Sequence, residues 1–430
     1  MIKLKVLINA YACSPKRGSE PGMGWNMCAH LAKYCELHII TEEENREEIE
    51  SVMTTFPQRK NMHFYYNPVS EKVREMARNQ GDWRFYRHYK KWQKLTLEIA
   101  KQIVSAQKID ILHQLNMIGF REPGYLWKIK GVPLVWGPIG GLKQFPVSYL
   151  QNAGIRINLF MRLKNIINIL QLKYDIRVNK AFKRSSLLIS SIPDSYRAIK
   201  KHKKIDSVLI PETGTFTTRD PSTERFQGNN LQVMWVGKFD FRKQLTLALK
   251  SLAATDNRGI TLNVYGEGNE DQEREALQLA TELDITDQVV WHGNKPNTDI
   301  HAAMREAQLF FFTSVSEDTS TVVLEAISNG LPVLCFDACG FGAVINETVG
   351  RKIPLSNPQQ SIIDFAAHLN MLYTNRQLLR KLSLNCKIIQ QNLSWDEKAK
   401  KVVYLYQKVL SSIEPSKGSR TGSEFYASDI

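Results

Sequence analysis

Two glutamates, Glu317 and Glu325, stand among an expected strand, loop and helix start that could place them against the hydroxyl groups of a sugar. Two solvated glutamates on a surface helix are the alternative. An apolar run at residues 309–312 precedes them and predicts a buried strand, which a polar loop separates from a helix. We expect Glu317 to lie before this helix and Glu325 about a turn and a half into it. Carboxylates accept pairs of hydroxyl hydrogen bonds, and both sugars and ribose present such pairs.

The start of the same helix predicts an anion site. Thr319 or Ser320 can cap the helix, because both residue types are preferred at helix N-termini. The free backbone amides of Thr319 to Val322, those of Thr321 and Val322 included, would then point into the crevice. Phosphate is the usual occupant of such a site, so the two glutamates would flank a bound phosphate group.

A second cluster of chemical interest follows another expected strand. Gly237 ends that strand, and Lys238, Arg242 and Lys243 follow within six residues, before a helix predicted to begin near Gln244. Cations placed on a diphosphate leaving group lower the barrier to its departure by electrostatics. The sequence contains no Asp-x-Asp pair that would hold magnesium or manganese. We therefore expect no metal cofactor and expect cations of the protein to take its place.

Glycine turns and one histidine follow expected strands in the first half. The turn that contains Gly22 lies between the first expected strand and a helix, where glycine lets the backbone approach a ligand closely. His113 and the turn at Gly140-Gly141 are expected to emerge at the carboxyl ends of two further strands, in the same crevice. The alternatives are that His113 has a structural role and that the glycine turns only connect a strand to a helix.

Short β-rich apolar runs alternate with longer helical stretches throughout the chain, a pattern typical of parallel sheets covered by helices. The expected strands of the first half are residues 5–10, 37–41, 63–66, 109–114, 134–136 and 187–190. Those of the second half are residues 232–236, 261–265, 288–291, 309–312 and 332–336. We predict an α/β protein with two doubly wound domains, at residues 1–210 and 211–400. A C-terminal helix that could pack back on the first domain and a polar tail follow at residues 401–430.

The composition excludes several classes of protein. The chain has 430 residues, 43% of them hydrophobic and 10% aromatic, which excludes a disordered or collagen-like chain. No apolar run approaches the roughly 20 residues of a transmembrane helix, and residues 1–13 fit a buried strand better than a secretion signal. The six cysteines form no CxxC motif and no zinc-spaced cluster. We therefore expect no disulfide framework, no metal site and a cytoplasmic location.

Positive charge is concentrated in the first half. Residues 1–210 carry 35 Lys and Arg against 17 Asp and Glu, a balance of +18, whereas residues 211–430 carry 22 against 26, a balance of −4. A basic half suits a polyanion, either a nucleic acid or an anionic membrane surface. Apolar residues mixed with cations at 152–204 and aromatics at 82–92 suit a membrane interface, but helices packed on the core explain them equally well. No nucleic-acid-binding motif accompanies them, so we expect no nucleic acid partner.

The second half resembles a known family. Glu317 and Glu325, with seven residues between them, resemble the E-x7-E signature of family-four retaining glycosyltransferases of the GT-B fold. Four further segments resemble other sequence motifs of the family: Val236-Gly237-Lys238 with Arg242-Lys243, Tyr265-Gly266-Glu-Gly268, Val290-Trp-His-Gly293 and Gly330-Leu-Pro-Val. Their order and separations match through residues 205–400.

The resemblance implies two Rossmann-like domains that face each other across a cleft and bind a nucleotide sugar, with UDP or GDP as the nucleotide. Glu325 would hold the ribose, and Glu317 would hold the hydroxyls of the transferred sugar. Lys238 and Lys243 would hold the diphosphate.

In the first half, the resemblance places Gly22 at the donor phosphates and His113 against the sugar. It implies a metal-independent transferase in which cations draw off the diphosphate and an acceptor hydroxyl attacks the same face of the sugar. We expect a saccharide acceptor, such as a lipid-linked or surface-polysaccharide precursor, at the cytoplasmic face of a membrane. A nucleotide-sugar epimerase of the same fold and a non-catalytic sugar- or polyanion-binding protein are the alternatives.

Overall fold

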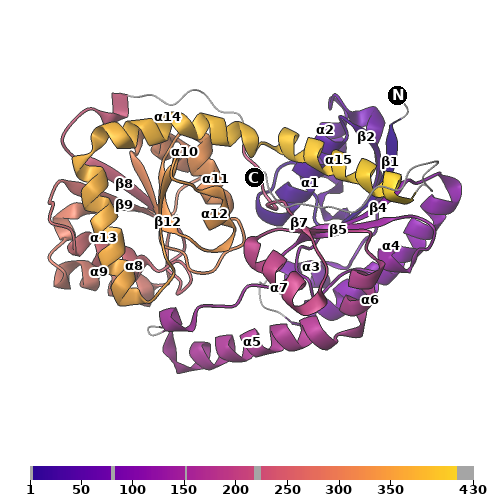
Figure 1. Cartoon of the computed structure of the whole chain (residues 1–430), viewed down its shortest axis with the longest axis horizontal. Helices are drawn as coiled ribbons and strands as arrows, with labels where there is room; N and C mark the ends of the chain where they lie inside the picture. The colour runs from indigo at the N-terminus through magenta and orange to yellow at the C-terminus, as the bar shows by residue number, and fades with distance from the viewer. Residues whose placement is uncertain (1–2, 79–82, 151–152, 217–223, 414–430) are drawn as a thin grey trace, which may run out of the picture.

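The sheet of the first domain has seven parallel strands in the order β3-β2-β1-β4-β5-β6-β7 (Figure 1). The computed structural model describes residues 3–78, 83–150, 153–216 and 224–413. The strands are β1 (Leu4–Ala10), β2 (Cys35–Thr41), β3 (Met62–Tyr66), β4 (Ile111–Asn116), β5 (Leu134–Ile139), β6 (Leu187–Ser190) and β7 (Val208–Leu209). Strands β4 and β5 are buried along their whole length, as expected for strands covered by helices on both faces.

The sheet of the second domain has six parallel strands in the order β10-β9-β8-β11-β12-β13. They are β8 (Leu231–Val236), β9 (Ile260–Tyr265), β10 (Val289–Gly293), β11 (Leu309–Phe312), β12 (Val333–Phe336) and β13 (Gly350–Ile353). Both sheets therefore have the doubly wound topology that the alternation of elements predicts, and this prediction is confirmed.

Helices cover both sheets (Figure 1). In the first domain they are α1 (Ser19–Leu31), α2 (Arg46–Met53), α3 (Glu71–Arg78), α4 (Phe85–Ala106), α5 (Gly154–Tyr174), α6 (Ile176–Arg184) and α7 (Pro193–Lys203). In the second they are α8 (Leu245–Ala253), α9 (Glu270–Glu282), α10 (Asn297–Glu306), α11 (Thr321–Ser328), α12 (Cys339–Val344), α13 (Pro358–Thr374) and α14 (Arg376–Asn392), and α15 (Trp395–Ile413) ends the described chain. None of these helices is long and apolar enough to cross a bilayer.

The two domains exchange segments. Helix α15 leaves the second domain along the top of Figure 1 and packs on the first, where Trp395, Val402 and Tyr406 join the hydrophobic core. In return, the segment after β5 places Phe145 and Tyr149 in the core of the second domain. The hydroxyl groups of Tyr149 and Ser361 lie 2.8 Å apart in a hydrogen bond that joins the domains. Each core is therefore completed by the other half of the chain.

The sequence analysis misses two strands, β7 and β13. Both lie at sheet edges, and the sequence of β13, Gly-Arg-Lys-Ile, lacks the apolar run by which the other strands are recognised. For the aromatic residues at 82–92, the structure favours packing on the core over a membrane interface. Phe85, Tyr89 and Trp92 form a buried cluster with Tyr11, whereas Trp83 of that segment is exposed; residue 82 lies outside the described residues, as does the tail from residue 414.

Candidate functional site

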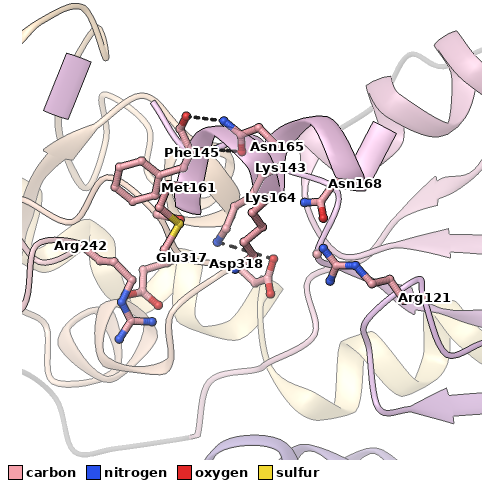
Figure 2. A pocket seen from close by; sticks show the side chains of 12 residues that line it. Arg121, Lys143, Phe145, Met161, Lys164, Asn165, Asn168, Arg242, Glu317 and Asp318 are labelled. Atoms are coloured by element: carbon pink, nitrogen blue, oxygen red, sulfur yellow. Dashed lines mark hydrogen bonds and ion pairs between the residues drawn. The ribbon is translucent and has the colours of Figure 1, made fainter. Parts of the chain in front are cut away.

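A pocket of about 280 Å³ opens between the two domains (Figure 2). Its first-domain wall consists of Arg121, Gly141, Lys143 and Phe145 together with Met161, Lys164, Asn165 and Asn168 of α5. Its second-domain wall consists of Arg242 and of three consecutive residues, Ser316, Glu317 and Asp318. Because these residues follow β4, β5, β8 and β11, the pocket lies beyond the carboxyl ends of both sheets, where doubly wound folds bind ligands.

The second-domain wall is built by two loops that are bonded to each other. Strands β8 and β11 are neighbours at the point where the strand order reverses, so the loops that follow them start side by side. The amide of Val315 donates to the carbonyl of Arg242 at 2.9 Å. The buried hydroxyl of Thr313 donates to the carbonyl of Lys243 at 2.8 Å and accepts from the indole of Trp235 at 3.0 Å. These bonds fix the two loops in register.

The same loops bring Lys243 and Glu317 together, as the sequence analysis expects. Nζ of Lys243 lies 2.7 Å from Oε1 of Glu317, and the hydroxyl of Ser314 donates to the same oxygen at 3.2 Å. Both charged side chains are largely enclosed, with exposed fractions of 16% and 21%. Gly237 packs closely against this lysine, since a Cβ at this position would lie 3.2 Å from Cγ of Lys243.

Cations outnumber acids around the pocket. Arg121, Lys143 and Lys164 of the first domain and Arg242 of the second line it together with Glu317 and Asp318 (Figure 2). Burial lowers the pKa of Lys164, and the positive charges of the other three cations lower it further. The four cations repel one another, and this repulsion costs free energy. A bound anion would reduce it. The pocket therefore has the electrostatic character of a site for an anion.

Asp318 lies between the two domains. Nζ of Lys143 approaches Oδ1 of Asp318 at 3.8 Å, and this oxygen accepts no hydrogen bond from any described residue. A Cβ on Gly140, in the turn after β5, would lie 3.2 Å from the other carboxylate oxygen. The glycine turn that the sequence analysis assigns to the crevice therefore borders the pocket.

The start of α11 differs in part from the prediction. Ser320 occupies the cap position, but its side chain makes no capping hydrogen bond. The amide and the hydroxyl of Thr319 both donate to Glu212, at 2.6 Å each, so the expectation that the Thr319 amide is free is wrong. Thr321 and Val322 are the first helical residues, and their amides have no intrahelical carbonyl to bond.

Glu325 lies one and a half turns into α11, as predicted, and is half-buried. Burial raises the pKa of its carboxyl, whereas the charge of His301 and a hydrogen bond with Asn297 act in the opposite direction. It does not line the pocket described above. Its role as the ribose ligand stays a prediction.

Two predicted residues of the first domain lie in its interior. His113 is fully buried: Nδ1 lies 2.5 Å from the hydroxyl of Tyr406, and Nε2 lies 2.7 Å from the carbonyl of Gly137. Burial lowers its pKa to about 4. The expectation that His113 emerges into the crevice is therefore wrong, because α15 covers it. The expectation that Gly22 lies in the turn before the first helix is wrong, because α1 begins at Ser19 and contains it. A Cβ on Gly22 would clash with the carbonyl of Arg17 at 2.4 Å, and its donor-phosphate role stays a prediction.

Lys238 is exposed and, like Lys243, is not among the residues that line the pocket; its role at the diphosphate stays a prediction. The sequence analysis also misses three cations of the pocket. Arg121 and Lys143 follow strands β4 and β5, and their position beyond a strand end is a signal that could have identified them. Lys164 lies within a helix, where no local pattern distinguishes it.

Residues 217–388 match the family model described as glycosyl transferases group 1. A curated relative, the GtfA subunit of the UDP-N-acetylglucosamine–peptide N-acetylglucosaminyltransferase of Streptococcus agalactiae, is 25% identical over 141 residues. This match covers 31% of the present chain and 27% of the relative, so the chain spans about a quarter of that protein's length.

Two solved structures match over almost the whole chain. Anabaena HepE in complex with UDP is 15% identical with a TM-score of 0.60, and the match covers 94% of this chain and 100% of HepE. The lipopolysaccharide outer core galactosyltransferase WaaB, in its apo form, is 13% identical with a TM-score of 0.60, over 94% and 99% of the two chains. The protein has the GT-B fold, and the family model together with these neighbours supports a GT-B glycosyltransferase.

Proposed function

We propose that the protein transfers a sugar from a nucleoside diphosphate donor to an acceptor hydroxyl, with retention of anomeric configuration and without a metal ion. The observation that carries this proposal is the cationic pocket at the carboxyl ends of both sheets, whose wall includes Glu317. Lys243 does not line the pocket itself, but its ammonium group pairs with Glu317 at 2.7 Å. The presence of UDP in the HepE structure supports a nucleotide donor, as does the match to the glycosyl transferases group 1 model.

In this proposal, Lys243 and Arg242 neutralise the diphosphate as it departs. Lys243 exchanges its contact with Glu317 for one with phosphate, which frees Glu317 to accept hydrogen bonds from the hydroxyls of the transferred sugar. Glu325 holds the ribose, and the amides of Thr321 and Val322 add partial positive charge at the phosphates. The acceptor hydroxyl attacks from the face that the diphosphate leaves, and a departing phosphate oxygen takes its proton.

The first prediction concerns Lys243. Replacement by methionine keeps the aliphatic stem and removes the charge that stabilises the diphosphate. We expect Lys243→Met to lower turnover by about 100- to 1000-fold. A thermal-shift screen of UDP- and GDP-sugars identifies the donor, since ligand binding to the folded state raises its apparent stability, and product analysis then gives turnover.

The matched control is Lys250→Met, on α8 of the same domain and away from the pocket, which should keep both the shift and the turnover. Glu325→Ala should abolish the shift. Full turnover by Lys243→Met contradicts the proposed chemistry, and so does an isomerised sugar formed without any acceptor.

We also propose that the acceptor is lipid-linked and that α5 rests on an anionic membrane surface. Most of the apolar side chains of this helix face water, the most exposed being Ile155, Leu159, Phe160 and Tyr174 with exposed fractions of 60–89%. The side that contacts the protein contains polar pocket residues, such as Lys164 and Asn168. In Figure 1 the helix lies along the lower edge of the molecule, across both domains.

The charge of the surrounding surface favours anionic lipid. Arg156, Arg162 and Lys173 are exposed on α5 among the apolar side chains, and the first half of the chain carries a surplus of positive charge. Apolar side chains interspersed with cations are typical of helices that lie in a lipid headgroup region. The pocket opens beside this helix, so an acceptor anchored in the membrane could reach it.

The second prediction follows. Leu159→Ser with Phe160→Ser should lower the fraction of protein that floats with vesicles containing anionic lipid by at least ~5-fold, since each change removes buried apolar area from the lipid contact. The matched control is Leu277→Ser with Ile363→Ser, exposed apolar residues of the second domain. Equal flotation with neutral and anionic vesicles contradicts the membrane assignment. A wild-type dimer that becomes a monomer in the α5 variant contradicts it as well, because α5 would then be a dimer interface.

A further inference from the structure

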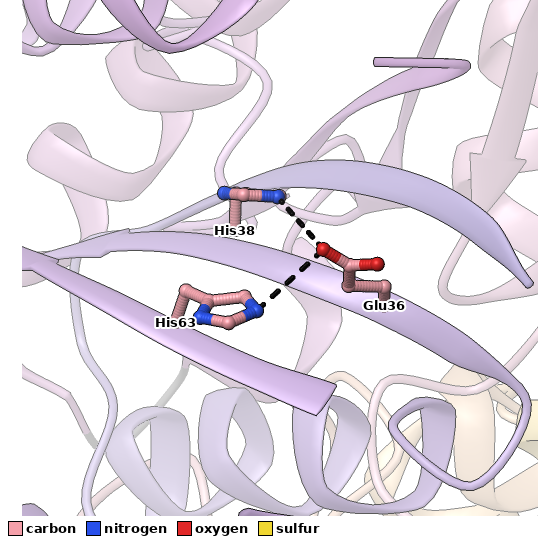
Figure 3. Close-up of side chains that lie close together, drawn as sticks. All are labelled: Glu36, His38 and His63. Atoms are coloured by element: carbon pink, nitrogen blue, oxygen red, sulfur yellow. Dashed lines mark ion pairs between the residues drawn. The ribbon is translucent and has the colours of Figure 1, made fainter. Parts of the chain in front are cut away.

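Three side chains of metal-ligand type meet on one face of the first sheet, away from the pocket. Glu36 and His38 are two residues apart on β2, so they point to the same face of the sheet. His63 on the edge strand β3 is the direct register partner of His38. One residue separates Glu36 from His38, whereas His63 lies on the next strand of the chain. The pairing of β2 with β3 brings it to the other two (Figure 3).

The spacing of these groups suits a tetrahedral metal ion. Nε2 of His38 and Nε2 of His63 each lie 3.6 Å from Oε1 of Glu36, and the three ligand atoms lie within 4.8 Å of one another. Ligands at about 2.1 Å from a tetrahedral zinc ion are separated by about 3.4 Å. His63 is half-exposed, with an exposed fraction of 45%, so its ring can close the remaining gap by a small rotation.

His38 is arranged as a metal ligand would be. Its side chain is 4% exposed, and Nε2 has no hydrogen-bond partner among the described residues although it points at Glu36 and His63. Nδ1 lies 3.0 Å from the hydroxyl of Tyr65. In the tautomer in which Nδ1 donates to that oxygen, Nε2 carries a lone pair that a metal ion could bind. A hydrogen bond of this kind is the usual outer-shell support of a metal-bound histidine.

We propose that Glu36, His38 and His63 bind a divalent transition metal ion of the zinc class, with water completing the coordination on the exposed side of His63. Lys5 competes for this site, because its Nζ lies 3.2 Å from Oε1 of Glu36. The same ammonium group also reaches Oε1 of Gln107 at 3.3 Å, so it keeps a partner when the metal takes the carboxylate.

The position of the site indicates a structural role. Glu36 and His63 are the second residues of their strands, so the cluster lies at the amino ends of β2 and β3, opposite the edge at which the sugar would be bound. A metal ion there would tie the edge strand β3 to its neighbour. We therefore expect zinc to raise the melting temperature and to leave sugar transfer unchanged.

The test measures zinc binding by the tag-free full-length protein, by isothermal titration and by metal analysis after dialysis. We expect one equivalent bound by the wild type, at least ~10-fold weaker binding by His63→Ala, and tighter binding by Lys5→Met. Cobalt should give the visible spectrum of a tetrahedral site in the wild type and lose it in His63→Ala.

His202→Ala, on α7 of the same domain, is the matched control and should bind like the wild type. The melting temperatures of the variants in chelator report whether they are folded, and zinc should raise the melting temperature of the wild type but not that of His63→Ala. The proposal is overturned if the wild type does not bind zinc stoichiometrically. It is also overturned if His63→Ala and His202→Ala change the zinc affinity to the same extent.

Discussion

At the scale of single residues, the ion pair between Lys243 and Glu317 has two effects at the proposed donor site. It neutralises both charges, and it holds both side chains in place. In the ligand-free arrangement each charge compensates the other in a largely enclosed position, which avoids the cost of an unpaired buried charge. A diphosphate brings its own negative charge and can replace the carboxylate at Lys243. The pair therefore holds both side chains near the positions that the proposed reaction requires.

A second residue-scale feature is the acidic group at the contact between the domains. The carboxylate of Glu20, in the first turn of α1, accepts a hydrogen bond from the amide of Ile118 at 2.7 Å. Burial raises its pKa to about 7, and the nearby charges of Asp318 and Glu212 also act to raise it. The folded chain therefore holds a proton that the unfolded chain releases between pH 4.5 and about 7.

The third prediction is a pH effect on stability. A raised pKa in the folded state stabilises the fold at low pH, and this contribution is lost as the pH rises from 4.5 to about 7. Glu20→Gln keeps an acceptor for Ile118 and cannot ionise, so its free energy of unfolding should fall less over this range. Urea unfolding at a series of pH values measures the two slopes, and identical slopes contradict the assignment.

At the scale of elements, the site depends on the two loops that leave β8 and β11. Thr313 lies at the end of β11 and is fully buried, and its hydroxyl bonds both the carbonyl of Lys243 and the indole of Trp235. The position of Lys243 is therefore set by a residue of another strand, seventy positions along the chain.

The fourth prediction tests this connection. Thr313→Val keeps the shape but leaves a buried carbonyl and a buried N–H without their partner, so we expect a loss of about 1–3 kcal/mol in the free energy of unfolding. Donor turnover should also fall, because Lys243 loses its support. Thr313→Ser retains the hydroxyl and should behave nearly like the wild type in both measurements; a Val variant as stable as the Ser variant would refute the role given to the hydroxyl.

At the scale of the whole molecule, each domain contributes a segment to the core of the other. Trp395 of α15 is 3% exposed in the core of the first domain, and Phe145 and Tyr149 of the first half complete the core of the second. Lys398 of α15 donates to the carbonyls of Pro211 and Thr213 in the connection between the domains. Neither core is complete without the other half of the chain.

The fifth prediction follows from this exchange. Trp395→Ala should lower the free energy of unfolding by about 3–5 kcal/mol through the cavity it leaves. For the wild type, calorimetry should show one cooperative unfolding transition, because each domain needs the segment supplied by the other. Tyr404→Ala, at an exposed position of the same helix, should change stability by less than about 0.5 kcal/mol. Two separate transitions in the wild type would contradict the interdependence of the domains.

The errors of the sequence analysis have specific physical causes. His113 follows the strand pattern that places a side chain in the crevice, yet α15 returns from the end of the chain and covers it. The aromatic residues of α4 suggest a membrane interface because their spacing is amphipathic, but Phe85, Tyr89 and Trp92 are buried in a cluster with Tyr11 of the loop after β1. In each case the local pattern is correct, and a distant segment decides what the side chain meets.

The order of strands and helices, the two doubly wound domains, and the approach of the Lys243 loop to Glu317 follow from the sequence alone, because apolar periodicity is local and parallel strands bring their carboxyl ends to one edge. Only the tertiary structure decides that Arg121, Lys143 and Lys164 share one pocket, that His113 is enclosed, and that His38 faces His63. These relations depend on strand register and on packing between segments far apart in the chain, and no local pattern encodes either.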